Sequence, residues 1–261
     1  MTRFNEWCTQ TKTLVTSTGR SPAPTRTFDL LILAPTKERH AVKVISSGMP
    51  SHYADPSRIA GLLSMLGKRS AAKYVKGKLP SLPNIRSGDL GEILCNAFVT
   101  ETTTFKFGIR RLRWKDHRNM SMRGEDVLAF SLAPKTGALQ VLKAEVKSGG
   151  TMKTAVINKA RAALDKDNSL PSPHALSFVA DQLSRAGEYL LSDAIDTAAL
   201  TKGLRGSQVT HMLFTFSGND PSKEMLKSLN GYLGKVKQQY VALQVQAHTT
   251  FIKSVFDKVT L

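Results

Sequence analysis

Two carboxylates and one lysine have the residue types and spacing that are most informative about chemistry in this chain. Asp126 begins an apolar run, a turn follows at 134–137, and a second apolar run ends in Glu145-Val146-Lys147. This pattern predicts a β-hairpin. Because successive side chains on a strand point to opposite faces, Glu145 and Lys147 would share a face. We therefore expect these two side chains and Asp126 to converge at one end of the hairpin.

These residue types suit the hydrolysis of a phosphodiester. Asp126 and Glu145 would supply hard oxygen ligands for Mg²⁺ or Mn²⁺. Lys147 would lower the pKa of the attacking water or stabilise the charge that develops on the phosphate. Glu125 adjoins Asp126, so the strand register decides which of these two acids would bind the metal.

The arrangement resembles the PD-(D/E)xK nucleases, which have the restriction-endonuclease-like fold. Three stretches resemble, more specifically, the pattern of the HamA family: Gly-Asp-Leu-Gly-Glu at 88–92, Arg-Gly-Glu-Asp at 123–126 and Ala-Glu-Val-Lys-Ser at 144–148. The resemblance implies a Mg²⁺- or Mn²⁺-dependent DNA nuclease that uses Asp126, and not Glu125, together with Glu145 and Lys147. It also implies an effector of a bacterial antiphage system, Hachiman, in which a superfamily 2 helicase subunit, HamB, restrains the nuclease. The sequence departs from the general motif at Glu125, which stands where a proline would precede the aspartate.

Glu92 is a further acidic candidate. Apolar residues recur at helical spacing around it and predict an amphipathic helix: Leu90, Ile93, Leu94, Ala97 and Phe98. Glu92 lies away from this apolar stripe. In nucleases of the resembled fold, a glutamate on the helix before the sheet often completes the metal site, which makes Glu92 a candidate catalytic residue. The alternative is a capping pair that Asp89 and Glu92 would form at the start of the helix.

The charge of the chain indicates a polyanionic partner. Its 261 residues include 37 Lys and Arg against 20 Asp and Glu, a formal net charge of +17. Lys and Arg neutralise phosphates independently of base sequence, so nucleic acid is the first candidate. The alternative is a basic protein that is merely soluble or that binds an acidic protein.

Eight basic residues are candidates for contacts with nucleic acid. The densest basic stretch is 68–78, in a predicted helix, and a second group lies in a predicted strand at 104–114. Lys159 falls inside the apolar stripe of a predicted helix at 152–167, so it would either extend outward past that stripe or point into the catalytic cleft. The eight candidates are Lys68, Arg69, Lys73, Lys76, Arg110, Arg111, Arg113 and Lys159.

Two other functions remain open. A non-catalytic DNA-binding or scaffold subunit of a helicase complex would keep the positive charge but lose the site, and the intact Asp126, Glu145 and Lys147 argue against it. A stand-alone restriction or repair endonuclease would need no helicase. The chain has no visible recognition domain and no Gly-x-x-x-x-Gly-Lys-Ser/Thr motif, which disfavours this second alternative.

Helical and strand patterns alternate along the chain and predict an α/β fold, with a mixed sheet flanked by helices and a restriction-endonuclease-like core. A small N-terminal β element would have strands at 28–34 and 41–45, after a loosely packed segment at 1–27. Further strands are expected at 209–216 and 241–247. Helices are expected at 56–78, 173–199, 222–240 and 250–259.

We expect an N-terminal segment at 1–80, with the β element and the basic helix, and a nuclease-like domain at 81–261; one continuous domain is the alternative. No apolar run approaches the ~20 residues that a membrane span needs, and no signal peptide is apparent. The two cysteines, Cys8 and Cys95, indicate neither a disulfide framework nor a zinc cluster. We therefore expect a cytoplasmic protein.

Overall fold

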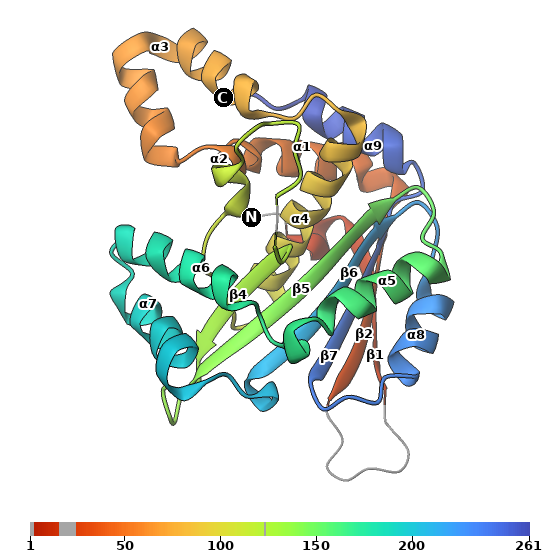
Figure 1. Ribbon diagram of the computed structural model, residues 1–261. Coiled ribbons are helices and arrows are strands. Elements are labelled where there is room, and N and C mark those ends of the chain that lie inside the picture. Colours follow the sequence, from red (N-terminus) through yellow and green to blue (C-terminus); the bar gives the residue numbers. More distant parts are fainter. Residues whose placement is uncertain (1–2, 16–24, 123) are drawn as a thin grey trace.

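The computed structural model describes residues 3–15, 25–122 and 124–261. Within these residues, seven strands form one mixed sheet in the order β1-β2-β7-β6-β5-β4-β3 (Figure 1). The strands are β1 (Cys8–Leu14), β2 (Arg26–Leu33), β3 (Lys106–Phe107), β4 (Val127–Leu132), β5 (Leu139–Gly149), β6 (Val209–Ser217) and β7 (Lys237–Gln244). β2, β7, β6 and β5 run parallel, whereas β1, β4 and β3 pair with their neighbours in the antiparallel direction. The predicted α/β class with a mixed sheet is confirmed.

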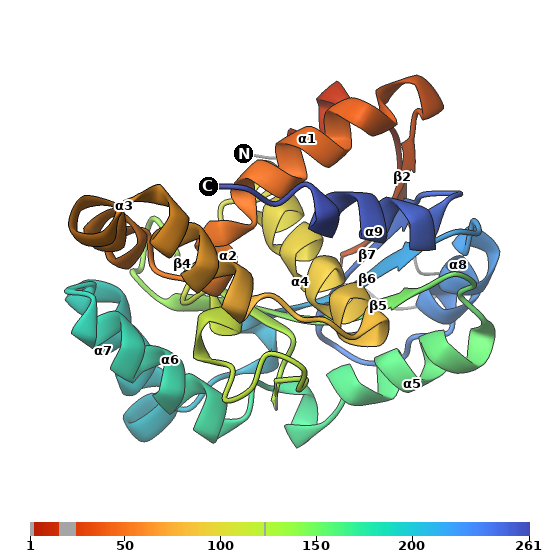
Figure 2. The ribbon, with the colours of Figure 1, turned by 90° about the horizontal axis from the view of Figure 1, so that it is seen from above.

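Helices cover both faces of this sheet (Figure 2). They are α1 (Glu38–Gly48), α2 (Pro50–Tyr53), α3 (Pro56–Lys78), α4 (Pro83–Thr102), α5 (Thr154–Leu164), α6 (Pro173–Arg185), α7 (Tyr189–Asp196), α8 (Ser222–Asn230) and α9 (His248–Asp257). The side chains of α1, α4 and α9 form one buried core with one face of the sheet. Those of α5 with α8, and of α6 with α7, pack on the opposite face.

The β4–β5 hairpin is formed as predicted, with Val127 paired to Ala144 and Leu132 to Leu139. Gly137 has a φ of +64° in the turn, a conformation that glycine adopts without the steric cost of a side chain. Ala144 and Val146 pack into the core beneath α4, and Val141 packs beneath α6. Odd and even positions of β5 therefore face different helices, as the period of two in a strand requires.

The predicted N-terminal β element is only half correct. The segment 28–34 lies largely in β2, but 41–45 belongs to α1 and is not a strand. Ala41, Val42 and Ile45 are buried on one side of this helix, and their spacing of one and four residues fits a helical face as well as a short strand. The sequence pattern could not separate the two over so few residues.

The segment 1–27 is also more structured than we predicted. Phe4 and Trp7 are 3% and 1% exposed and belong to the core, and β1 pairs with β2 along its whole length. The side chains of β1 are mostly exposed, which explains why its sequence lacks a strand-like apolar pattern. Residues 16–24 of the predicted segment lie outside the described part of the chain.

Two further predictions are wrong in part. The segment 104–114 contains only the two-residue β3, followed by a 3-10 turn at Arg111–Trp114. The helix predicted at 222–240 ends at Asn230, and β7 begins at Lys237. Apolar side chains in a connecting segment can mimic either element, because burial by neighbouring helices does not require regular structure.

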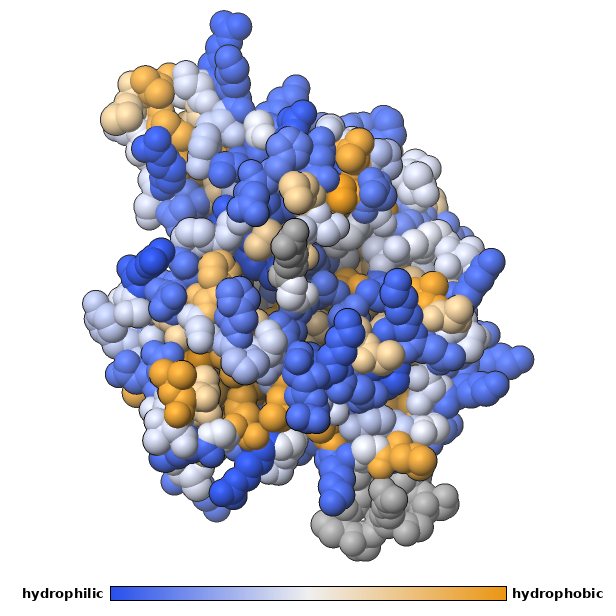
Figure 3. All heavy atoms as spheres, in the orientation of Figure 1, coloured by the Kyte–Doolittle hydropathy of each residue, from blue (hydrophilic) through white to orange (hydrophobic). Residues whose placement is uncertain are grey.

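Helix α3 extends away from the rest of the molecule (Figures 1 and 2). Gly67 interrupts it with φ 76° and ψ 170°, so the predicted helix at 56–78 is present but kinked. Apolar side chains gather on its exposed surface (Figure 3), where Leu63, Met65 and Leu66 are 39%, 69% and 59% exposed. In the described residues we find no helix that combines the length and the apolar character needed to cross a bilayer.

Candidate active site

Asp126 lies beside the segment of β5 that carries Glu145 and Lys147. Its Oδ2 atom accepts a hydrogen bond of 2.8 Å from the backbone N–H of Val146. Continuing the β4–β5 register by one residue beyond Val127 and Ala144 places Asp126 opposite Glu145. Burial and the negative charge of Glu145 together raise the pKa of Asp126 to about 6, although the hydrogen bond from Val146 and the positive charge of Lys147 oppose the rise. Such a shift is expected when two carboxylates lie close together in a partly dry site.

Glu145 and Lys147 share the face of β5 that is turned toward α5 and α6, as predicted. Lys147 Nζ forms an ion pair with Glu145 Oε1. The side chain of Glu145 is 17% exposed and that of Lys147 is 26% exposed. Val146, between them, is 8% exposed and packs on the opposite face. The pair is therefore held at the edge of the core but remains open to solvent.

The structure separates Glu125 from Asp126. Glu125 accepts hydrogen bonds from the N–H of Ser172, at 2.7 Å, and from the Ser172 hydroxyl, at 3.2 Å. Ser172 is the N-cap of α6, so Glu125 is bound to the start of that helix. Arg123, which precedes these residues in the 123–126 stretch, lies outside the described residues.

Glu92 reaches the site from α4 because that helix packs unusually closely on β5. A methyl group added at Gly91 would meet Val146 Cγ1 at 3.0 Å and Ser148 Cβ at 3.3 Å. Burial, with a smaller contribution from the negative charge of Asp126, raises the pKa of Glu92 to about 8, and the cation of Arg111 opposes this rise. The glutamate therefore shares an electrostatic environment with Asp126.

Glu92 faces Arg111 across 3.7 Å, from Oε2 to Nε. This distance is too long for a hydrogen bond. The Oε2 atom of Glu92 and the Nε and Nη2 atoms of Arg111 are buried and make no hydrogen bond within the chain. Buried polar atoms without partners are uncommon and call for an explanation. Here Glu92 and Arg111 form an ion pair without a hydrogen bond, and both interact electrostatically with the proposed metal ligand Asp126.

The capping interpretation of Asp89 and Glu92 is wrong. Helix α4 begins at Pro83, so Asp89 lies within the helix and not at its start. Both carboxylate oxygens of Asp89 accept hydrogen bonds of 2.9 Å from Lys115 Nζ, and Oδ2 also accepts one of 2.9 Å from Tyr53. Asp89 therefore ties the segment that carries Arg111 to α4.

Lys143 was missed by the sequence reasoning. It lies two residues before Glu145 on the same face of β5, is 3% exposed, and donates to the carbonyl oxygens of Lys166 and Leu170 at 3.2 and 2.8 Å. Burial lowers its pKa. A period of two from Glu145 would have identified it. Its contacts hold the connection between α5 and α6 over the sheet.

The structure does not gather the predicted nucleic-acid-binding residues in one place. Arg113 pairs with Asp55 at 2.9 Å, and Arg110 donates to the Ser51 hydroxyl. Of these residues, Arg111 lies at the acidic cluster, which consists of Glu92, Asp126 and Glu145. Lys159 is exposed on α5, and no described contact joins it to that cluster. Lys68, Arg69, Lys73 and Lys76 are exposed on α3.

The donor set of the cluster fits a small hard cation with few protein ligands. Among residues 3–15, 25–122 and 124–261, no group of three or more His, Cys, Asp or Glu side chains is arranged to hold a metal ion. Mg²⁺ often takes only one or two carboxylates and completes its shell with water and phosphate oxygens. Asp126 and Glu145 meet that requirement, and a cation would relieve the repulsion that helps to raise the pKa of Asp126.

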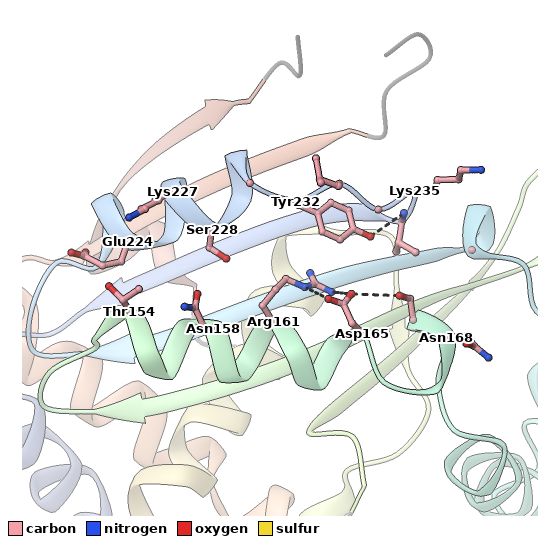
Figure 4. Close-up of a pocket in the computed structure, with 16 residues that line it drawn as sticks. Thr154, Asn158, Arg161, Asp165, Asn168, Glu224, Lys227, Ser228, Tyr232 and Lys235 are labelled. Carbon is pink, nitrogen blue, oxygen red and sulfur yellow. Dashed lines mark hydrogen bonds and ion pairs between the residues drawn. The ribbon is translucent and has the colours of Figure 1, made fainter. Parts of the chain in front are cut away.

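A cavity of about 800 Å³ lies away from this cluster, between α5 and α8 (Figure 4). Arg161 points into it, but its guanidinium is engaged by Asp165 at 2.7 Å, by His211 at 2.7 Å and by the ring face of Tyr232 at 4.9 Å. None of the predicted site residues lines this cavity. It is therefore a separate feature of the α5 side of the sheet.

Comparison with known proteins gives two matches. The family model described as HamA matches residues 1–259. A protein of Bacillus cereus, described as Hachiman protein HamA, is 25% identical over 197 residues, which cover 74% of this chain and 68% of that protein. The residues that the family model matches include all three stretches that resemble the HamA pattern, 88–92, 123–126 and 144–148.

Proposed function

The chain belongs to the HamA family, and from this premise we propose that it is a metal-dependent DNA nuclease of a Hachiman antiphage defence complex. The Bacillus cereus relative carries the Hachiman name, which supports the same defence role here. The substrate would be the phosphodiester backbone of DNA, and a helicase subunit would control access to it.

One observation carries the proposal of hydrolysis: the position of Asp126 beside Glu145 and Lys147. The hydrogen bond from Val146 fixes the Asp126 carboxylate at the edge of β5. The ion pair holds the ammonium of Lys147 at the Glu145 carboxylate. Two anionic groups and one cation in this arrangement can bind a metal and stabilise a charged transition state.

Asp126 and Glu145 would hold Mg²⁺ or Mn²⁺. When bound, such an ion supplies Lewis-acid polarisation of the phosphate and lowers the pKa of an attacking water. Lys147 would orient that water and stabilise negative charge on the phosphate, which also requires it to exchange its contact with Glu145 for one with substrate. Glu92, with its pKa of about 8, holds a proton at neutral pH and would release it to solvent when a cation at Asp126 offsets the negative charge there.

The fold supports a PD-(D/E)xK assignment as part of the same proposal. A helix with an acidic residue, α4, precedes an antiparallel hairpin whose strands bring Asp126 and the Glu145-x-Lys147 pair together. A parallel neighbour, β6, follows on the other side of β5. This is the order that the resemblance to restriction-endonuclease-like nucleases implies.

The surface of α3 has features that suit the binding of a partner protein as well as of DNA. Its exposed Leu63, Met65 and Leu66 form an apolar group of the kind that often marks an interaction site. Four exposed basic residues on the same helix, Lys68, Arg69, Lys73 and Lys76, would contact phosphates. We propose a superfamily 2 helicase subunit as the partner on the strength of family membership.

The direct test is cleavage of plasmid DNA by the purified chain, alone and with a helicase subunit of a Hachiman system, in Mg²⁺ or in EDTA. Asp126→Asn and Glu145→Gln should abolish cleavage. Glu125→Gln is the matched control, because the carboxylate of this neighbour accepts its hydrogen bonds from Ser172. Cleavage that persists in EDTA and in both cluster variants would overturn the proposal.

A further inference from the structure

A second cavity, of about 460 Å³, opens directly beside Asp126. Its walls come from the segment 109–122, from the start of β4 and from α6, and Asn96 of α4 adds a polar side chain. A cavity of this size lies within the range that takes one small organic molecule. A stack of base pairs would not enter it.

Aromatic and flexible apolar side chains line much of this cavity. Trp114 is 45% exposed, and its ring meets that of Phe178 edge to face, with centroids 6.3 Å apart and an angle of 87°. Met120 is 51% exposed at the same cavity. An exposed indole that is held in place by a second ring is a platform on which a planar group can stack.

The polar groups in the cavity suit a nucleotide better than a purely apolar ligand. Arg111 lines the cavity, and its Nε atom faces Glu92 Oε2 at 3.7 Å without a hydrogen bond. A guanidinium cation in the cavity wall favours an oxygen acceptor, and phosphate or a base carbonyl supplies one. Asn96 and His174 also line the cavity, and their side chains can pair with the edge of a base.

We propose that this cavity holds an unpaired nucleobase of the strand to be cut, stacked on Trp114, so that the chain acts on single-stranded or locally melted DNA. The inference rests on the proposed nuclease function, because it assigns the substrate class of the same site. Asp126 lines the cavity and belongs to the acidic cluster. A base in the cavity therefore places the adjoining phosphate next to Asp126 and Arg111.

The test uses the fluorescence of Trp114 in the full chain, in the Glu145→Gln background so that strands stay intact. The chain contains two tryptophans, and the other, Trp7, is 1% exposed in the core. The probes are a short oligothymidylate and a blunt-ended DNA hairpin, each titrated in Mg²⁺. We expect the oligothymidylate, and not the hairpin, to quench the fluorescence, because only an unpaired base can stack on the indole.

Variants at position 114 test whether stacking is the cause. Trp114→Ala should weaken binding of the oligothymidylate by about tenfold. Trp114→Phe should retain most of the affinity, because it keeps an aromatic ring against Phe178. Equal quenching by hairpin and single strand, or unchanged affinity in Trp114→Ala, would overturn the inference. If Trp114→Ala does not fold, as judged by circular dichroism, the comparison of the two probes decides.

This outcome is separable from the proposed function, because binding is measured without cleavage. If wild-type chain cuts DNA in Mg²⁺ and Glu145→Gln does not, but duplex binds as well as single strand, the nuclease proposal stands and the base cavity is rejected. If oligothymidylate binds through Trp114 and no cleavage occurs under any condition, the cavity stands and the nuclease proposal fails.

Discussion

The carboxylate of Asp126 accepts a hydrogen bond of 2.8 Å from the backbone N–H of Val146, the residue between Glu145 and Lys147. Beyond the end of the β4 ladder, this N–H has no strand partner on that side, and the side chain of Asp126 takes the place of one. The same contact that satisfies the backbone of β5 therefore fixes an acid beside the Glu-x-Lys pair. This single hydrogen bond therefore both satisfies the backbone of β5 and positions a proposed metal ligand.

Divalent metal should stabilise the wild-type chain through Asp126 and Glu145. A ligand that binds only the folded state at 100 times its dissociation constant adds about 2.7 kcal/mol to the unfolding free energy. We expect Mn²⁺ to raise the melting temperature of the wild type relative to EDTA, and Asp126→Asn or Glu145→Gln to remove that rise. Glu125→Gln should respond as wild type does. An equal rise in all four proteins would place the metal elsewhere.

Replacing Gly91 should cost more than replacing Gly88 on the same helix. A methyl group at Gly91 would lie 3.0 Å from Val146 Cγ1, whereas one at Gly88 would meet nothing within 4 Å. Overpacking typically costs about 1–3 kcal/mol, and alanine in an open helical position gains about 0.5–1 kcal/mol over glycine. Urea denaturation of Gly91→Ala and Gly88→Ala should show these opposite signs. A similar midpoint for both would mean that α4 can shift away from β5.

The hairpin and the acidic residues on it could be predicted because the signals are local. Alternating apolar residues, a turn and the Glu145-x-Lys147 spacing all lie within a short stretch, and the period of two assigns the faces of β5. Strand β6 and the second half of β7 could be predicted for the same reason, as compact apolar runs, whereas the first half of β7 was predicted as helix. The order in which the strands pair could not be predicted, because it depends on contacts between residues that are distant in sequence.

The segment 104–114 could not be predicted in this way. Its conformation is set by Arg113, which donates to the carbonyl of Ser51 and pairs with Asp55. These partners lie some 60 residues earlier in the chain. The role of Asp89 was hidden likewise, because Lys115 reaches it from a connecting segment. Neither interaction leaves a periodic pattern in the sequence.

The buried carboxyl of Glu92 should make stability depend on pH. Its pKa rises from 4.5 in its ordinary state to about 8 in the fold. The unfolded chain therefore loses this proton at lower pH than the folded chain, and the unfolding free energy falls as pH rises from about 4.5 to about 8. In EDTA, Glu92→Gln should show a shallower decline over this window than wild type. Urea titrations at pH 5 and pH 8 measure the difference, with Glu188→Gln, an exposed carboxyl, as control. Parallel declines in wild type and Glu92→Gln would contradict the assignment.

The buried ion pair between Lys115 and Asp89 should affect the unfolding free energy far more, when it is broken, than an exposed pair of similar length does. Their side chains are 4% and 5% exposed, and removing one partner of a buried pair typically costs about 3–5 kcal/mol. Lys115→Met should lower the unfolding free energy on that scale and displace the segment that carries Arg111. Lys253→Met is the matched control, because Lys253 pairs with Asp257 at 2.7 Å on the surface. Chemical denaturation compares the two, and a loss in the control as large as in Lys115→Met would count against this account.

The basic residues of α3 should contribute to DNA binding through phosphates. Each phosphate contact adds about 0.9 to the slope of log affinity against log salt on duplex DNA. Replacing Lys68, Arg69, Lys73 and Lys76 together by Gln should therefore lower that slope by up to about 4. Fluorescence anisotropy of a labelled DNA at several salt concentrations measures it, in the Glu145→Gln background so that the DNA stays intact.

A matched set of four basic residues makes this last prediction specific to α3. Lys37, Arg39, Lys43 and Lys258 are also exposed, and they lie on or beside α1 and α9, so their replacement by Gln removes the same charge from another part of the surface. If DNA binds along α3, replacing the control set should change the slope of log affinity against log salt only a little. If net charge alone attracts DNA, the two sets should weaken binding equally, because long-range attraction depends on total charge and not on its place. Equal slopes in both sets would therefore exclude α3 as a specific contact surface, while leaving the acidic cluster as the remaining point of contact with the backbone.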